Sequence, residues 1–278
     1  MTIRDLRKDK ANSADYDVCV VGSGPAGLAI TKVLSDNNFH VCLLESGGLK
    51  FEQPVQSLNH GTQQGFRDDL GTARPRQFGG ASSVWRGHCA TMDPDDFLPE
   101  RWSGSIGWPL DYSDLAGYYR RAADFLDFDY RLLESNSYQN NDFLAFDGDR
   151  VQTKLFIQRP TRLGQELKDW IKQVDSVDLW VHASLSSVKS KGNKIEYVTA
   201  RDLADKELKV KARIFVVAAG GLENPRLLLS FANGNLIPID QNARKAIGRY
   251  FSLHPHFFYG ALLLTGQAAE KPLYLPQS

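Results

Sequence analysis

The chain has few cysteines, no excess of charge of either sign and no long hydrophobic run, and each absence excludes a class of protein. Its three cysteines, Cys19, Cys42 and Cys89, are odd in number and irregularly spaced, which argues against a disulfide framework and against a metal site of the zinc type. Lysine plus arginine number 33, as do aspartate plus glutamate, so we expect no surface for nucleic acid. No apolar stretch approaches the roughly 18 residues of a membrane span.

Residues 1–14 are rich in charge and lack the apolar core of a secretory signal. We therefore expect a flexible leader on a cytoplasmic protein whose cysteines are reduced. The 278 residues are enough for one large domain or two smaller domains, each with a hydrophobic core.

The segment from Asp17 to Glu45 carries the strongest signal in the chain. Residues 17–21 form an apolar run typical of a buried parallel strand. Gly22, Gly24 and Gly27 follow in the G-x-G-x-x-G spacing. In this pattern the first glycine permits a tight turn, the second admits a pyrophosphate, and the third lets the helix pack on the strand.

The elements after these glycines complete a strand–helix–strand unit. A helix from Pro25 to about Ser35 would direct its N-terminal N–H groups at the phosphate. His40 to Leu44 then form a second strand, and Glu45 ends it where a carboxylate accepts the hydroxyl groups of an adenosine ribose. The sequence therefore predicts an ADP-binding unit.

The region from Gly47 to Gly107 shows little helical or strand periodicity and is rich in Gly, Gln, Arg and Ser. Loops of this length are uncommon unless they wrap around something, and a large cofactor is the natural candidate. Beyond it, residues 112–128 predict an amphipathic helix with Ser113 or Asp114 as N-cap. Residues 164–173 predict another helix.

The later part of the chain predicts a hairpin and a return to the first sheet. Residues 179–188 and 194–202 form the hairpin, residues 207–212 a third strand and residues 213–218 a fourth, buried strand. Ala219 and Gly220 then lead into a helix that begins at Asn224-Pro225. A second strand–glycine–helix junction is expected beside the first unit.

Taken in order, these motifs resemble the glucose–methanol–choline (GMC) family of FAD-dependent oxidoreductases, in its bacterial branch. The resemblance extends from about Asp15 to about His256. It rests on the ADP-binding unit and on the run from Arg76 through Gly79-Gly80 and Ser82-Ser83 to Trp85. Further matching segments are residues 85–97, Gly107-Trp108-Pro109, residues 216–229, Gly248-Arg249 and His254-Pro255.

The resemblance implies an α/β fold with a Rossmann-like FAD-binding domain. That domain is expected over residues 15–60 and 176–247, a flavin-contacting loop and helical insertion over 61–175, and the start of an antiparallel substrate domain over 248–278. Val84 stands where some relatives attach flavin through a histidine, so noncovalent FAD is implied. Arg76 would pair with phosphate, the alternative being a solvated loop arginine. The residues assigned to FAD are Gly22, Ser23, Gly24, Pro25, Ala26, Gly27, Glu45, Ser46, Arg76, Gly79, Gly80, Ser82, Ser83, Leu185, Ala219 and Gly220.

The resemblance also implies oxidation of an alcohol or sugar CH–OH group by hydride transfer to flavin N5. None of the chain's histidines lies in a segment that matches the family's base, so no catalytic residue is assigned. The six are His40, His60, His88, His182, His254 and His256.

Two interpretations stay open. In the first, the chain is the FAD-binding portion of an oxidoreductase that lacks its C-terminal catalytic part, with that part or an electron-acceptor protein as partner. In the second, it is a short FAD-binding partner or regulatory protein without alcohol-oxidising activity. A disulfide- or NADH-dependent flavin reductase fits less well, because neither a C-x-x-C pair nor a second G-x-G-x-x-G is present.

Overall fold

The structure is a computed structural model that describes residues 2–10, 15–64, 70–72, 74–99, 104, 106–133, 156–159, 162–249 and 251. The chain divides into two compact units. The first comprises residues 1–85 and 161–251, and the second comprises residues 86–160 and 252–278. The first unit thus groups residues 61–85 and 161–175, which we expected in the insertion, with residues 1–60 and 176–251.

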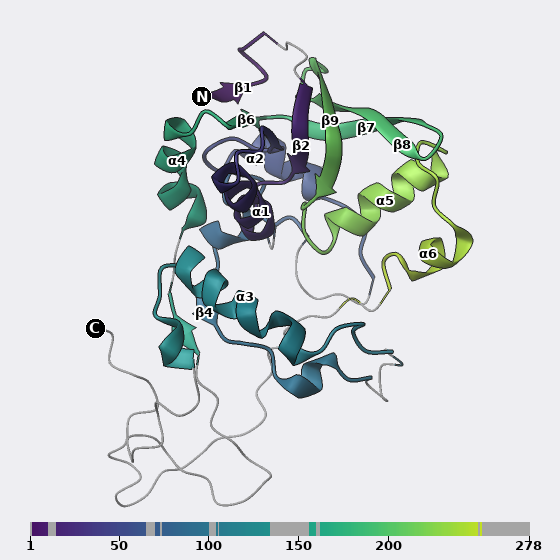
Figure 1. Cartoon of the computed structure of the whole chain (residues 1–278). Coiled ribbons are helices and arrows are strands. Elements are labelled where there is room, and N and C mark those ends of the chain that lie inside the picture. The colour runs from purple at the N-terminus through teal and green to yellow at the C-terminus, as the bar shows by residue number, and fades with distance from the viewer. Residues whose placement is uncertain are drawn as a thin grey trace, which may run out of the picture. The chain divides into compact units, whose positions relative to one another are not determined.

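A seven-stranded sheet forms the centre of the first unit (Figure 1). Its first five strands are mutually parallel, and its last two pair antiparallel. In spatial order they are β1 (Thr2–Asp5), β6 (Val177–Val181), β3 (Val41–Leu44), β2 (Asp15–Val21), β9 (Glu207–Val217), β8 (Lys194–Arg201) and β7 (Ser184–Lys191). This is the predicted mixed α/β architecture with a parallel-dominated sheet.

Helices pack on the parallel part of the sheet because its strands are apolar on both faces. Every residue of β3 and of β6 is buried, as expected for strands covered on two sides. Helix α1 (Pro25–Asp36) contacts β2 and β3, and α4 (Leu163–Gln173) contacts β1 and β6. Helix α5 (Glu223–Asn233) contributes Leu227 and Phe231 to the core. Short helices α2 (Gln53–Gln56) and α6 (Gln241–Ala246) complete the described α-helices of this unit.

Three sequence expectations for the strands were wrong. The single strand expected over 179–188 is two strands, β6 and β7, because His182 takes a left-handed backbone with φ of 56° and ends β6. The two strands expected over 207–218 are one, β9. Its first part pairs antiparallel with β8 and its second part parallel with β2, as the pairs Leu208–Ala200 and Val216–Val20 show. Residues 2–5, expected in a flexible leader, form β1 and pair with β6.

The return of the chain to the first βαβ unit is confirmed, since β9 lies beside β2 (Figure 1). The hairpin of β7 and β8 is also confirmed, with Gly192 at φ of 58° in its turn. The turn needs this left-handed conformation, which glycine adopts without strain.

The second unit contains α3 (Tyr112–Phe125), the two-stranded pair of β4 (His88–Cys89) and β5 (Ile157–Gln158), and two single turns at Pro94–Phe97 and Tyr130–Leu133. Helix α3 is capped by Asp111 and not by Ser113 or Asp114, because the Asp111 carboxylate accepts the N–H groups of both. The expected substrate-domain strands beyond residue 251 lie outside the described residues. Among the described helices, none has the length and hydropathy needed to cross a membrane.

Candidate nucleotide-binding site

The turn after β2 needs glycine at two of its three motif positions. Gly22 has φ of 100° and donates its N–H to the carbonyl of Leu44 at 2.8 Å. A Cβ atom there would lie 2.5 Å from the carbonyl oxygen of Ala218, and one on Gly27 would overlap the carbonyl oxygen of Gly22. Close packing of β2, α1 and the β9 junction therefore excludes side chains at both positions.

Gly24 has a different environment. No protein atom lies within 4 Å of the position that its Cβ would occupy. It is the N-cap of α1, with φ of −70°, and Pro25 and the exposed Ala26 open the helix. The backbone here faces open space at the positive end of a helix dipole, which is the arrangement that admits a phosphate group.

The carboxylate of Glu45 joins the end of β3 to this glycine turn. It is 5% exposed. Its Oε2 accepts the hydroxyl of Ser23 at 2.5 Å and the Ser23 N–H at 3.1 Å, and its Oε1 accepts the Gly47 N–H at 2.8 Å and the Ser46 hydroxyl at 3.3 Å. A carboxylate has about four acceptor positions. The four donors fill these positions. A ribose hydroxyl that binds Glu45 would therefore replace one of the two serine hydroxyls and would leave the two backbone N–H groups in place.

The Gly79-Gly80 loop lies directly against the first turn. Gly79 donates its N–H to the carbonyl of Ser23 at 3.1 Å, and a Cβ on Gly80 would lie 2.8 Å from the Cα of Gly24. Both loop glycines have positive φ, 91° and 50°. The hydroxyls of Ser82 and Ser83 donate to the carbonyls of Gly79 and Gly80 at 2.7 and 2.8 Å, which closes a short 3₁₀ turn over residues 80–83.

Helix α4 supports this loop through a residue that the sequence analysis missed. Arg162, at the N-cap of α4, donates through Nη1 to the carbonyls of Ser82 at 3.1 Å and Trp85 at 2.7 Å. At Gly164 a Cβ would overlap the carbonyl of Phe78. No local pattern indicates these contacts, because they join residues that are far apart in the chain.

Arg76 is half-buried and hydrogen-bonded within the protein, unlike a solvated loop arginine. Its side chain is 14% exposed. It donates from Nε to Asn59 Oδ1 at 2.6 Å and from Nη1 to the Ser46 hydroxyl at 3.2 Å, and Nη2 lies 3.6 Å from Glu223. Burial lowers its pKa, and the charges of Glu223 and Glu45 oppose that shift. Arg76 therefore fixes Ser46 beside Glu45.

The carboxylate of Glu223, at the start of α5, lies close to three arginines. It accepts Arg74 at 2.8 Å and Arg226 at 2.7 Å, and it faces Arg76. Burial raises the pKa of Glu223, but the hydrogen bonds from Arg226 and Arg74 outweigh it and hold the pKa below its ordinary value. This cluster ties the loop around residue 75 to the second glycine junction.

That second junction lies beside the first. Ala218 donates its N–H to the carbonyl of Val21 at 2.8 Å, and Ala219 donates to the side chain of Asn224 at 2.8 Å. Gly220 has φ of 93°, and a Cβ there would meet no atom within 4 Å. Ala219 and Gly220 are thus brought to the same edge of the sheet as Gly22.

Leu185 occupies a different place. It lies in β7, pairs with Ala200 and packs against the core. Among the described residues, its side chain makes no hydrogen bond or core contact with the glycine turn. The nearest link is through Ala183, whose N–H donates to the carbonyl of Glu45 at 2.8 Å.

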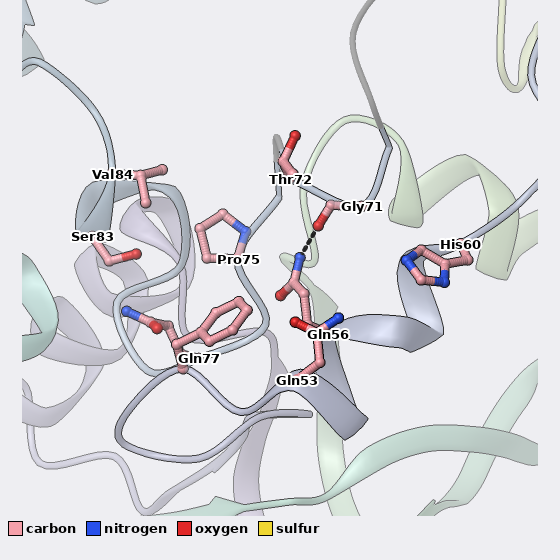
Figure 2. Close-up of a pocket in the computed structure, with 10 residues that line it drawn as sticks. Gln53, Gln56, His60, Gly71, Thr72, Pro75, Gln77, Ser83 and Val84 are labelled. Carbon is pink, nitrogen blue, oxygen red and sulfur yellow. Dashed lines mark hydrogen bonds between the residues drawn. The ribbon is translucent and has the colours of Figure 1, made fainter.

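A pocket of about 470 Å³ lies beside the 3₁₀ turn of the glycine loop (Figure 2). Ser83 and Val84 line one side, and the side chains of α2 and the following turn line the other. Gln56 is held there by the carbonyl of Gly71, with which it forms the bond drawn in Figure 2. The lining residues are Phe51, Gln53, Gln56, His60, Gly71, Thr72, Pro75, Gln77, Ser83 and Val84.

The chain is similar in sequence and in fold to several known proteins. The chain is 25% identical over 315 residues to a 2-methyl-1,2-propanediol dehydrogenase from Mycolicibacterium austroafricanum, an alignment that covers 87% of this chain and 56% of that protein. The fold matches that of a formate oxidase with a TM-score of 0.53 at 16% identity, over 79% of this chain and 48% of the oxidase. The same values hold for an Aspergillus oryzae formate oxidase variant studied for modification of its FAD.

The predicted resemblance to the GMC family is confirmed. No family model matches the chain. Like the FAD-binding domain of GMC oxidoreductases, the structure is a mixed α/β fold with a parallel-dominated sheet. The chain spans about half the length of the relatives that it matches, 56% of the dehydrogenase and 48% of the oxidase.

Proposed function

We propose that the chain is the FAD-binding portion of a GMC-type oxidoreductase that oxidises a CH–OH group of a small alcohol or sugar. The observation that carries this proposal is the convergence of three separate segments on one edge of the sheet. These are the Gly22–Gly27 turn, the Glu45 carboxylate and the Gly79-Gly80 loop. The name of the sequence relative, a diol dehydrogenase, supports an alcohol as substrate.

The residues present fit FAD. Glu45 would accept the hydroxyls of the adenosine ribose, and the N-terminus of α1 at Gly24 would receive the pyrophosphate. The open positions at Gly24 and Gly220 let a ligand approach the backbone on both sides of the turn. When bound, flavin would supply the hydride-accepting chemistry, at N5.

Noncovalent attachment is part of the proposal. The side chain beside the glycine loop is that of Val84, which is 60% exposed and carries no nucleophile. Ser83 and Val84 line the pocket described above. Its other lining residues include the aromatic side chain of Phe51 and the side-chain amides of Gln53 and Gln77. Such a lining suits a flat ring with carbonyl edges.

We also propose a cytoplasmic location. Cys19 and Cys42 are in register on the neighbouring strands β2 and β3, and both are buried and free. Free cysteines at such close positions suit a reducing compartment.

A second candidate is an FAD-binding partner protein without alcohol-oxidising activity of its own. It agrees with the sequence analysis, which assigns no catalytic residue among the six histidines. Anaerobic incubation of the FAD-loaded protein, made as the complete product of its gene, with an alcohol and sugar panel distinguishes the two. Bleaching of the flavin absorbance by any member supports the oxidoreductase, and bound FAD that no member bleaches favours the partner protein.

A further inference from the structure

The two terminal nitrogens of the Arg76 side chain lead to different carboxylates, those of Glu45 and Glu223. Nη1 donates to the Ser46 hydroxyl at 3.2 Å, and that hydroxyl donates to Glu45 Oε1 at 3.3 Å. Nη2 lies 3.6 Å from Glu223 Oε2. Arg76 is therefore in ionic contact with Glu223 and is separated from Glu45 by a single hydroxyl group. All four residues belong to the first unit.

Glu223 also supplies the negative charge for two further arginines. Its Oε1 accepts from Arg74 Nη1 at 2.8 Å, and its Oε2 accepts from Arg226 Nε at 2.7 Å. Burial lowers the pKa of Arg76, the charges of Glu223 and then Glu45 raise it, and the charges of Arg226 and Arg74 lower it. If the Glu223 charge were removed, the two arginines would still repel the Arg76 guanidinium, and of these charges only that of Glu45 would attract it.

The Glu45 carboxylate has two acceptor positions that a ligand can take. The backbone N–H groups of Ser23 and Gly47 fill the other two positions, at 3.1 and 2.8 Å. A guanidinium can bind a carboxylate through two parallel N–H bonds, and such charge-assisted bonds are stronger than those between neutral groups. Arg76 turned onto Glu45 would therefore occupy both positions and exclude a ribose hydroxyl.

We propose that Glu223 is a positioning residue that holds Arg76 away from Glu45 and so keeps the Glu45 carboxylate open to the ribose hydroxyls of the nucleotide. The inference rests on the proposed function, because it concerns the same nucleotide. Asn59 does not prevent the turn, since it accepts from Arg76 Nε at 2.6 Å and leaves both terminal nitrogens able to change partner. Loss of the Glu223 charge should therefore reduce recognition of the ribose hydroxyls and not only the stability of the loop.

The test compares ADP with 2′,3′-dideoxy-ADP, which lacks both ribose hydroxyls, by calorimetric titration of the full chain. The ratio of the two affinities isolates the contribution of the hydroxyls, because a general loss of phosphate binding affects both nucleotides alike. We expect wild type to bind ADP about tenfold more tightly than the dideoxy nucleotide, and Glu223→Gln to bind the two about equally. Glu196→Gln, at an exposed position of β8, is the matched control and should keep the wild-type ratio.

A second substitution separates positioning from a merely structural role. In the double variant Glu223→Gln/Arg76→Met the competing guanidinium is absent, so the wild-type ratio should return. A Glu223→Gln variant that keeps the wild-type ratio would overturn the inference. So would a double variant that still binds the two nucleotides equally, since removal of Arg76 cannot repair a loop distorted by the loss of Glu223. Equal binding of both nucleotides by wild type would overturn it as well.

Two further measurements guard against ambiguous outcomes. If Glu223→Gln does not fold, Glu223→Asp takes its place, because it keeps the charge but draws it away from Arg76. Its ratio should fall below that of wild type, and an unchanged ratio would overturn the inference. If wild type binds neither nucleotide, the proposed function fails, and the crystal structure of the ligand-free Glu223 variant still tests the inference. Arg76 hydrogen-bonded to Glu45 supports it, whereas Arg76 still bonded to the Ser46 hydroxyl refutes it.

Discussion

A methyl group on Gly80 would come within 2.8 Å of the Cα of Gly24, so the two glycine motifs of this chain touch each other in space. The contact is reinforced by the hydrogen bond from the Gly79 N–H to the carbonyl of Ser23. A turn that would bind phosphate and a loop that would lie along a cofactor are thereby fixed as one surface.

The second and third glycines of the first motif should respond differently to alanine. Gly24→Ala introduces a methyl where no protein atom lies within 4 Å, so thermal stability should hardly change while FAD affinity falls by about 1–3 kcal/mol. Gly27→Ala forces a methyl onto the carbonyl of Gly22 and should destabilise the fold itself. Melting curves and FAD titrations of both variants check this, and a Gly24→Ala variant that binds FAD normally would contradict the assignment of the turn.

Replacement of Glu45 should weaken the binding of FAD. Loss of a charge-assisted bond to the ribose corresponds to about 1.5–3 kcal/mol. Because Glu45 also accepts from Ser23 and Gly47, Glu45→Ala is expected to lower the melting temperature as well. Glu45→Gln keeps the shape and isolates the effect of charge. Unchanged FAD affinity in both variants would refute the role of Glu45.

Arg162→Ala should destabilise the Gly79-Gly80 loop although Arg162 is not among the residues assigned to FAD. It removes the donor to the carbonyls of Ser82 and Trp85, and the loss of bonds from a charged group should cost about 1.5–3 kcal/mol. FAD affinity should fall together with the free energy of unfolding. Arg213→Ala is the matched control, since its side chain is 81% exposed. Equal unfolding curves for the two variants would argue against the supporting role of Arg162.

Acid should weaken the attachment of β1. The pKa of Asp5 in the folded chain is about 2, below its ordinary value of 3.8. A lowered carboxyl pKa contributes stability that is present above about pH 4 and is lost as pH falls through about 2. We expect the free energy of unfolding of wild type to fall by roughly 1–2 kcal/mol more across that range than that of Asp5→Asn. Urea unfolding at a series of pH values measures this free energy, with Asp205→Asn, at an exposed position, as the control. Parallel pH curves for wild type and Asp5→Asn would contradict the expectation.

The sequence predicted the features that depend on local pattern. The turn from Gly22 to Gly27, helix α1 and the hairpin at Gly192 all carry their signal within a few neighbouring residues. Their strands are apolar, their turns contain glycine, and the spacing between the glycines is set by the turn itself.

The features that the sequence did not predict depend on residues that are far apart in the chain. Strand β1 has no apolar pattern and is held by pairing with β6 and by the bonds of Asp5 to His182. His182 breaks an apolar run by adopting a positive φ, which is uncommon for a histidine. The roles of Arg162 and Glu223 likewise arise only when distant segments meet, so periodicity gives no indication of them.

The most direct test of the account is the absorbance spectrum of the purified full chain after incubation with FAD and removal of the free cofactor. We expect a yellow protein with about one flavin per chain that is released on denaturation, and a Gly24→Ala variant that melts like wild type but retains less flavin. A wild-type chain that stays colourless and takes up no FAD, although folded by the same melting assay, would contradict the central claim.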